Sequence, residues 1–170
     1  MSNNTTNYAF LMIEYDTPQF IKDLQQKISK DDIFEKEGSY GIERETHVTL
    51  VPCLDNDIDL DEIKKKLLPL KDYEIFLSNI SSFKNEEFDV LKCDAQSMNL
   101  YKTNREITDK FETHSNYKEY HPHMTVAYLK KDTSKKYEKE ILDSLFVLKP
   151  KRFHFSYYKD GVEEAHEYFK

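Results

Sequence analysis

The stretches that decide the fold are His47–Leu50, with the sequence HVTL, and His123–Val126, with the sequence HMTV. Both read as histidine, any residue, threonine and an apolar residue, and each begins a compact apolar run that is typical of a buried strand. On a strand, residues two apart point to the same face, so each histidine is predicted to lie beside its threonine. The intervening apolar residues turn to the other face and hold the strand on the core.

Outward from these two stretches, hydrophobic periodicity and turn residues predict seven strands and four helices. Thr17, Asp59 and Ser97 stand where helix N-caps are expected, and Asp59 with Glu62 resembles a capping box. The strands are expected at residues 8–14, 47–52, 73–77, 88–93, 123–129, 152–158 and 164–169. The helices are expected at residues 18–29, 60–68, 98–114 and 134–145.

This mixture of hairpins and helices favours an α+β fold over a parallel doubly wound one. Each half of the chain gives a helix, a strand that begins with histidine, another helix and a strand pair, an order that suggests an internal duplication. No linker interrupts the sequence. We therefore expect a single domain over residues 8–170, after a disordered N-terminus at residues 1–7.

Composition excludes several classes of protein. The chain has 170 residues with a net charge of -7, which argues against coating of long nucleic acid. The charge is uneven, because residues 1–63 hold 5 basic against 14 acidic side chains, whereas residues 64–170 hold 20 against 18. No segment resembles a signal peptide or a membrane span, and Cys53 and Cys93 are predicted to be reduced thiols. We expect a cytoplasmic protein with no obligate protein partner.

The repeated motif predicts acid–base chemistry on a phosphodiester. One imidazole can remove a proton from an attacking oxygen while the other, protonated, donates one to the leaving oxygen. The hydroxyls of Thr49 and Thr125 can donate to phosphate oxygens and hold the phosphorus between the rings of His47 and His123. This mechanism requires neither a metal nor another cofactor.

The two motifs make the sequence resemble the 2H phosphoesterases, the LigT-like or 2'-5' RNA ligase-like proteins. Residues 120–128, with the sequence YHPHMTVAY, are similar to the family's second motif. The resemblance implies a catalytic pair, His47 and His123, with Thr49 and Thr125 binding phosphate. It also implies two pseudo-symmetric lobes of antiparallel sheet, with helices outside and a central cleft. The compact form and the HPHMTVAY stretch further resemble phage anti-CBASS nucleases, which cleave cyclic oligonucleotide signals in the host cytoplasm.

Other residues carry alternatives. His121 and His123 could share a face and bind zinc, but no third ligand is apparent, so we expect no metal. Tyr8 and Tyr128 are favoured as rings that stack on a base, ahead of Phe10, Tyr120 and Tyr158.

Two further segments are expected to face solvent. His154 and Ser156 form a third match to the motif, on a strand whose other face carries Phe153 and Phe155, so a solvated outer face is expected for them. A basic stretch near the second motif could steer an anion, although a solvated helix face is the simpler interpretation. Its residues are Lys130, Lys131, Lys135, Lys136, Lys149, Lys151 and Arg152.

The sequence thus predicts a metal-independent phosphodiesterase that acts on a small nucleotide or short oligonucleotide. Cyclic oligonucleotides, 2'-5' linked oligonucleotides and 2',3'-cyclic phosphates all fit the same residues. Two alternatives remain open. One is a binding module whose histidines only hold a phosphate, and the other is an RNA 2'-5' end-joining activity. The sequence does not decide which histidine is the acid and which is the base.

Overall fold

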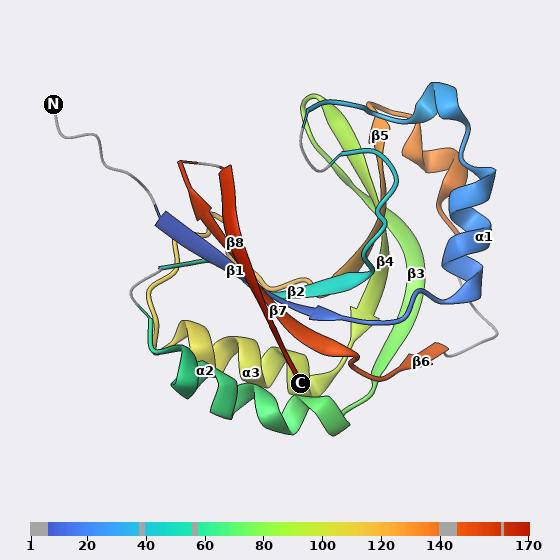
Figure 1. Ribbon diagram of the computed structural model, residues 1–170. Coiled ribbons are helices and arrows are strands. Elements are labelled where there is room, and N and C mark those ends of the chain that lie inside the picture. The colour runs from blue at the N-terminus through green and yellow to red at the C-terminus, as the bar shows by residue number, and fades with distance from the viewer. Residues whose placement is uncertain (1–6, 38–39, 56–57, 140–145, 161) are drawn as a thin grey trace, which may run out of the picture.

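The computed structural model describes residues 7–37, 40–55, 58–139, 146–160 and 162–170, which form an α+β fold as predicted (Figure 1). The strands of the described residues are β1 (Asn7–Glu14), β2 (His47–Asp55), β3 (Ile75–Lys84), β4 (Phe88–Gln96), β5 (His123–Lys130), β6 (Phe146–Leu148), β7 (Arg152–Lys159) and β8 (Val162–Phe169). The helices are α1 (Gln19–Lys27), α2 (Leu60–Leu67) and α3 (Met98–Thr108), with 3-10 turns at η1 (Lys30–Asp32), η2 (Leu68–Asp72) and η3 (Ser134–Tyr137).

One antiparallel sheet runs through both predicted lobes, in the order β6-β3-β4-β5-β2-β1-β7-β8. The motif strands β2 and β5 are neighbours at the centre of this sheet, where its two halves meet. They pair with one another only at Val48 and Met124, near their first residues, and then run apart. Beyond this pair the edge of β5 is paired instead with residues 33–34 and 41–43. Glu43 N–H donates to the carbonyl of Val126 over 3.1 Å, and Tyr128 N–H donates to Gly41 over 2.8 Å.

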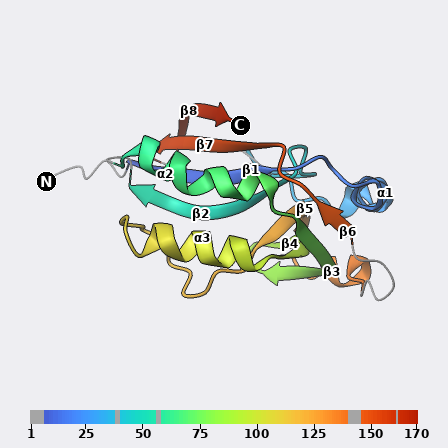
Figure 2. The same cartoon turned by 90° about the horizontal axis from the view of Figure 1, so that it is seen from below.

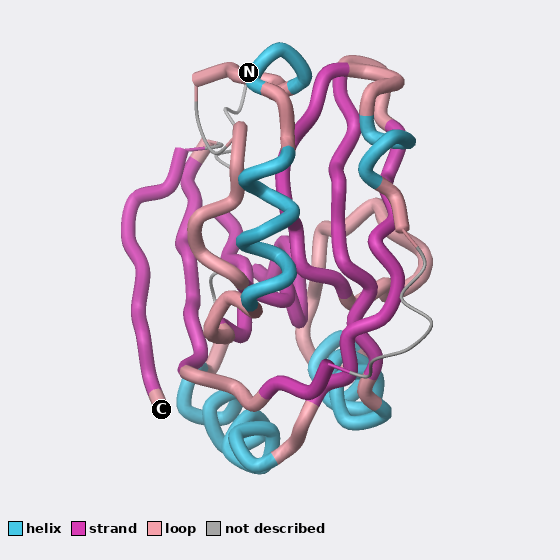
Figure 3. Tube along the Cα trace, turned by 90° about the vertical axis from the view of Figure 1, so that its right-hand side faces the viewer, coloured by secondary structure: helices cyan, strands magenta, loops and turns pink. Residues whose placement is uncertain are grey.

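Two of the three helices, α1 and α3, pack on the half of the sheet opposite the strand that precedes them. Helix α1 follows β1 but packs beside β5, where Gln25 Nε2 donates to the carbonyl of Val126 over 3.1 Å; Figure 3 shows α1 lengthwise in front of the strands. Helix α3 follows β4 but packs beside β2, where Asn104 Nδ2 donates to the carbonyl of Leu50 over 2.7 Å. Figure 2 shows α2 and α3 together on the β1–β2–β7 half. This exchange binds the two halves into one structure. No helix of the described residues has the length and apolar character needed to span a membrane.

Strand alternation builds the core. Val48, Leu50, Met124 and Val126 are fully buried, as the motif pattern predicts, and the outer strands add Leu11 and Ile13 from β1 and Phe153 and Phe155 from β7. Burial of such side chains contributes roughly 1.5–3 kcal/mol each. The motif strands are therefore held on the core by every second residue, which leaves their other face for chemistry.

Helix starts agree only in part with the predictions. Asp59 caps α2, accepting from the N–H groups of Asp61 and Glu62, so this cap is confirmed. Thr17 is not a cap. Pro18 takes that position, and the Thr17 hydroxyl instead lies 2.6 Å from the hydroxyl of Thr46. Ser97 occupies the N-cap position of α3 without a side-chain hydrogen bond, and α3 ends at Thr108 rather than near His114.

The predicted helix at 134–145 was wrong over its first part, because only η3 forms there and Glu138 is extended. The seryl hydroxyl of Ser134 binds Lys84 and Ser82, which ties this segment to the sheet rather than to a helix. Residues 140–145 lie outside the described residues, as do 1–6 of the predicted disordered N-terminus. The three-residue strand β6 was not predicted, and β3 runs on to Lys84 beyond its predicted end at Leu77.

Candidate active site

The two motifs meet on one face of the sheet. The first four residues of β2 and of β5 have the same burial pattern, in which the histidine and threonine are half-buried and the apolar residues are buried. Val48 pairs with Met124 in antiparallel register. Residues on either side of such a pair lie opposite one another, so His47 faces Thr125, and Thr49 faces His123. The predicted same-face placement is confirmed, and each histidine has the other motif's threonine as its neighbour.

Both imidazoles are oriented by the same backbone contact. His47 Nδ1 lies 2.7 Å from the carbonyl oxygen of Glu45, and His123 Nδ1 lies 2.7 Å from that of His121. A carbonyl oxygen only accepts, so Nδ1 carries the proton in both rings. Nε2 is then the working nitrogen of each, with no hydrogen-bond partner among the described residues. The hydroxyls of Thr49 and Thr125 likewise have none within this part of the chain. Two imidazole nitrogens and two hydroxyls are thereby available to a ligand.

His123 has the more enclosed setting. The edge of its ring meets the Phe83 ring, with 4.9 Å between ring centroids. Burial lowers the pKa of His123, and the nearby positive charge of Lys92 and the other imidazole, His47, lower it further against the opposing effects of the His121 carbonyl and Asp94. His123 is thus disposed to be neutral at neutral pH.

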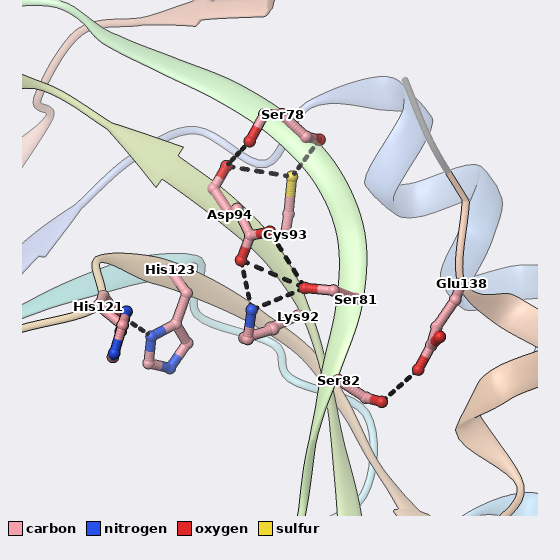
Figure 4. Close-up of polar contacts among 9 residues, drawn as sticks. All are labelled: Ser78, Ser81, Ser82, Lys92, Cys93, Asp94, His121, His123 and Glu138. Carbon is pink, nitrogen blue, oxygen red and sulfur yellow. Dashed lines mark hydrogen bonds and ion pairs between the residues drawn. The ribbon is translucent and has the colours of Figure 1, made fainter. Parts of the chain in front are cut away.

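A buried cation stands beside the second motif (Figure 4). In the register of β4 with β5, Lys92 lies opposite Thr125, and Asp94 lies opposite His123. Lys92 is only 6% exposed; its Nζ contacts Asp94 and donates to the Ser81 hydroxyl over 2.7 Å. It also lies 4.5 Å above the centroid of the Phe83 ring. A lysine is buried at such a cost only with its charge compensated, and Asp94 provides this.

The first motif also has an acidic and a basic residue on the strands beside it. Glu14 of β1 lies opposite His47, and on the next strand Arg152 of β7 lies opposite Glu14. Glu14 is 6% exposed, and its Oε2 accepts from Arg152 Nε over 2.5 Å. Sequence reasoning named Arg152 only as part of the basic stretch and missed Glu14, Lys92 and Asp94. The signal for the last two was a basic and an acidic residue two apart on one strand, which places both on one face, but the predicted strand ended at Cys93.

The predicted solvated outer face of β7 is wrong. His154 is 6% exposed and Ser156 is 2% exposed, because β8 pairs along β7 and the ring of Tyr168 stacks on His154 at 4.3 Å. His154 Nδ1 also lies 3.3 Å from Glu14 Oε1. The face that carries both motifs therefore continues across β1 onto the β7–β8 hairpin.

The two predicted stacking rings lie on opposite halves of the sheet. Tyr8 of β1 is stacked on Tyr158 of β7, with 5.3 Å between centroids and 7° between ring planes, on the motif face of β1. Tyr128 packs its ring at 5.2 Å and 76° from that of Tyr40, and burial raises its pKa to about 12. Tyr120 is half-buried and donates to the carbonyl oxygen of Thr49 over 3.1 Å, a structural role.

Two hollows flank the motif strands. The larger, of about 560 Å³, is lined by Tyr128 together with Tyr40, Glu43 and Arg44 of the preceding loop. The smaller, of about 370 Å³, is lined by residues that surround the start of β2, including Glu45 and Thr46, and by charged side chains on both sides. Neither hollow is lined by His47 or His123, so the histidine pair stands beside these hollows rather than in them.

The remaining candidates are placed as follows. His121 Nε2 pairs with Glu119 at 3.5 Å, and no metal-binding group of the described residues includes His121 with His123. The basic stretch is divided among ion pairs, of Lys136 with Asp32 and of Lys151 with Asp16, and does not form one patch on a helix. Cys53 and Cys93 are free, and burial raises the pKa of the Cys93 thiol to about 12.

Comparisons with known proteins found one family model and a solved structure of similar fold. A family model described as the 2'-5' RNA ligase superfamily matches residues 16–160, which span both motifs. Among solved structures, the structure of Kluyveromyces marxianus Usb1 is similar, with a TM-score of 0.57 at 10% sequence identity. The match covers 92% of this chain and 98% of that chain. At this identity the likeness concerns the fold alone. No match was found among curated proteins.

Proposed function

Because the chain belongs to the 2'-5' RNA ligase superfamily, the 2H phosphoesterases, we propose that it is a phosphodiesterase that cleaves a small nucleotide substrate by paired-histidine acid–base catalysis. The observation that carries this proposal is the crossed arrangement of the motifs, in which each histidine faces the threonine of the other motif. A phosphate placed between the strands would meet an imidazole and a hydroxyl from each side.

The proposed reaction needs one base and one acid. Neutral His123 takes a proton at Nε2 from the attacking oxygen, which is either a 2'-hydroxyl beside the scissile phosphate or a water molecule. That oxygen bonds to phosphorus as the bond to the leaving oxygen breaks. His47, protonated at Nε2, gives its proton to the leaving oxygen. A 2'-hydroxyl yields a 2',3'-cyclic phosphate, and water opens one. The lowered pKa of His123 supports its assignment as the base.

The threonines serve the phosphate rather than the proton transfers. Both hydroxyls lie on the motif face with no partner in the described chain, and each can donate to a non-bridging oxygen. Lys92, which lies opposite Thr125 and is paired with Asp94, supplies a cationic group on the strand beside the phosphate position. Since charge on these oxygens grows as the attacking oxygen adds, such donors stabilise the transition state more than the bound substrate.

Two parts of the protein can receive a nucleobase of the substrate. Tyr8 stands on the motif face of β1, four residues from Met12, and Met12 pairs with Thr49. This separation is about 13 Å along a strand. The hollow beside Tyr128 is large enough for a nucleobase. A substrate that uses both would be an oligonucleotide, and a cyclic oligonucleotide signal, as in phage counter-defence, is the member of this class that the sequence resemblance favours.

A substrate panel tests the proposal. Cyclic di- and trinucleotides, 2'-5' oligoadenylate, 2',3'-cyclic nucleotides and RNA ends with a cyclic phosphate are incubated with the protein in EDTA, and products are separated by chromatography. We expect cleavage of at least one phosphodiester that persists in EDTA and is lost in both His47→Ala and His123→Ala. His114→Ala, a change of an exposed histidine paired with Asp55, is the matched control.

Each other outcome contradicts the proposal in a defined way. Binding without turnover indicates a binding module, and joining of RNA ends without cleavage indicates a ligase. Turnover that is unchanged in either motif variant overturns the paired-histidine mechanism.

A further inference from the structure

We propose that His154, Glu163 and His166 of the β7–β8 hairpin bind a divalent transition-metal ion of the zinc class. In the described part of the chain, the ligand atoms of these three side chains all lie within 4.8 Å of one another. The site lies beside the proposed reaction centre and takes no part in the proposed cleavage. The hairpin forms the edge of the sheet in Figure 1.

A strand irregularity brings the three ligands to one face. Ser156 pairs with His166 and Tyr157 with Ala165, but Tyr158 then pairs with Glu163 rather than with Glu164. This bulge shifts the register by one residue, which turns Glu163 toward the face that His154, Ser156 and His166 share. Bulges commonly re-aim side chains in this way. Without it, period-two alternation would send Glu163 to the opposite face.

His154 is held as metal-binding histidines are. Its Nδ1 lies 3.3 Å from Glu14 Oε1, and its side chain is 8% exposed. Glu14 Oε1 is buried and has no hydrogen-bond partner among the described residues. A histidine whose Nδ1–H faces a carboxylate presents Nε2 to a metal in a fixed tautomer, and this outer carboxylate strengthens the ligand. Nε2 of His154 accepts a hydrogen bond from the Ser156 hydroxyl over 3.1 Å, a bond that a metal ion would replace, and lies beside the strand position of His166.

The donor set selects the class of metal. Two imidazoles and one carboxylate suit zinc, whereas magnesium and calcium prefer oxygen ligands alone. Zinc ligands stand about 2.0–2.1 Å from the ion, so tetrahedral donors lie roughly 3.4 Å apart. Glu163 and His166 are exposed, and rotation of their side chains can close the present separation. A second group, Glu14 with Glu45 and His154, shares the same histidine but supplies only one imidazole.

Calorimetric titration of the EDTA-stripped, full-length protein with Zn²⁺, and with Co²⁺ followed by its visible absorption, tests this site. We expect one ion per chain, a raised thermal midpoint with metal, and affinity at least tenfold weaker in both His166→Ala and Glu163→Gln. Both changes are at exposed positions, so the apoprotein should keep its melting midpoint. His121→Ala removes the exposed imidazole nearest the second motif and is the matched control.

Absence of binding overturns the proposal, as does unchanged affinity in His166→Ala and Glu163→Gln. Loss of binding in His121→Ala places the ion at the motif instead, which also overturns it. The readouts are metal affinity and stability, so the result is independent of whether the phosphodiesterase proposal holds.

Discussion

Strands β2 and β5 carry the same motif in crossed register but in different electrostatic surroundings. Each histidine is oriented by a carbonyl two residues earlier, at 2.7 Å, and each faces an acidic residue on the strand outside it, Glu14 or Asp94. The cations differ. Lys92 lies one strand from His123, whereas Arg152 lies two strands from His47. The two histidines are therefore inequivalent, as suits a reaction with one acid and one base.

Substitution of the two histidines is expected to have the largest effect, and it can show which histidine is the acid and which is the base. His47→Ala and His123→Ala should each lower kcat by about 10²- to 10⁴-fold on a substrate with an oxygen leaving group. When the leaving oxygen is replaced by sulfur, departure no longer needs a proton donor, because a thiol is far more acidic than an alcohol. Turnover should then recover in His47→Ala but not in His123→Ala, measured as single-turnover rates.

Recovery in His123→Ala alone would reverse the assignment of the two roles. If turnover recovers in neither variant, the proposal that one histidine is the acid and the other the base is contradicted.

The threonines test whether the crossed arrangement holds the phosphate from both sides. Thr49→Val and Thr125→Val keep the shape of the strand and remove only the hydroxyl, so each should lower kcat/KM by about tenfold or more through loss of a hydrogen bond to a charged oxygen. Thr→Ser at either position should restore most of the activity. Steady-state kinetics on the preferred substrate, with the melting midpoint as the folding control, measures this. A loss confined to one threonine would show that only one half contacts the phosphate.

Substitutions of Tyr8 and Tyr128 are expected to have smaller effects on activity than those of the histidines and threonines. Stacking of a base on an aromatic ring contributes roughly 1–3 kcal/mol. Tyr8→Ala should therefore raise KM by about five- to tenfold with little change in kcat, and Tyr8→Phe should behave like the unchanged protein. Tyr128→Ala tests the hollow in the same assay. Equal KM values in Tyr8→Ala and the unchanged protein would remove Tyr8 from the substrate site.

The motifs could be predicted from the sequence because each lies within four residues. Over that span, both the repeated residue pattern and the period-two alternation of a strand can be recognised. Strand and helix positions followed for the same reason wherever apolar periodicity was strong, as at β1, β5 and α2. The polar second half of β3 was missed because Ser78, Asn79, Ser81 and Ser82 do not look like a buried strand. Ser81 is held there by Lys92 and Asp94, and Ser82 by Glu138 and Ser134, which are contacts that the strand's own sequence does not encode.

The same limit explains the error at His154. Its strand alternates as an exposed edge would, but β8 covers that face through pairing that depends on the whole hairpin. The pairing of β2 with β5 is equally non-local, because Val48 and Met124 come together only when the whole sheet forms. Each motif was therefore predictable, whereas the inequivalence of their surroundings required the register.

That inequivalence can be tested through the pH dependence of the reaction. The positive charge of Lys92 lowers the pKa of His123, second only to burial among the effects that lower it. Lys92→Met removes this charge and leaves Asp94, whose negative charge raises the pKa. His123 would then stay protonated to higher pH, and a base must be deprotonated to act. The acidic limb of the kcat/KM profile should therefore move to higher pH, whereas Lys92→Arg, which keeps the charge, should leave it in place.

The other half supplies the matched control. Arg152→Met removes a cation two strands from His47, and the acidic limb, which reports the base His123, should not move. The melting midpoint of each variant separates loss of fold from a change in titration. An acidic limb that stays in place in Lys92→Met, or moves equally in Arg152→Met, would mean that the nearby lysine does not distinguish the two histidines. The division of roles would then have to come from the substrate.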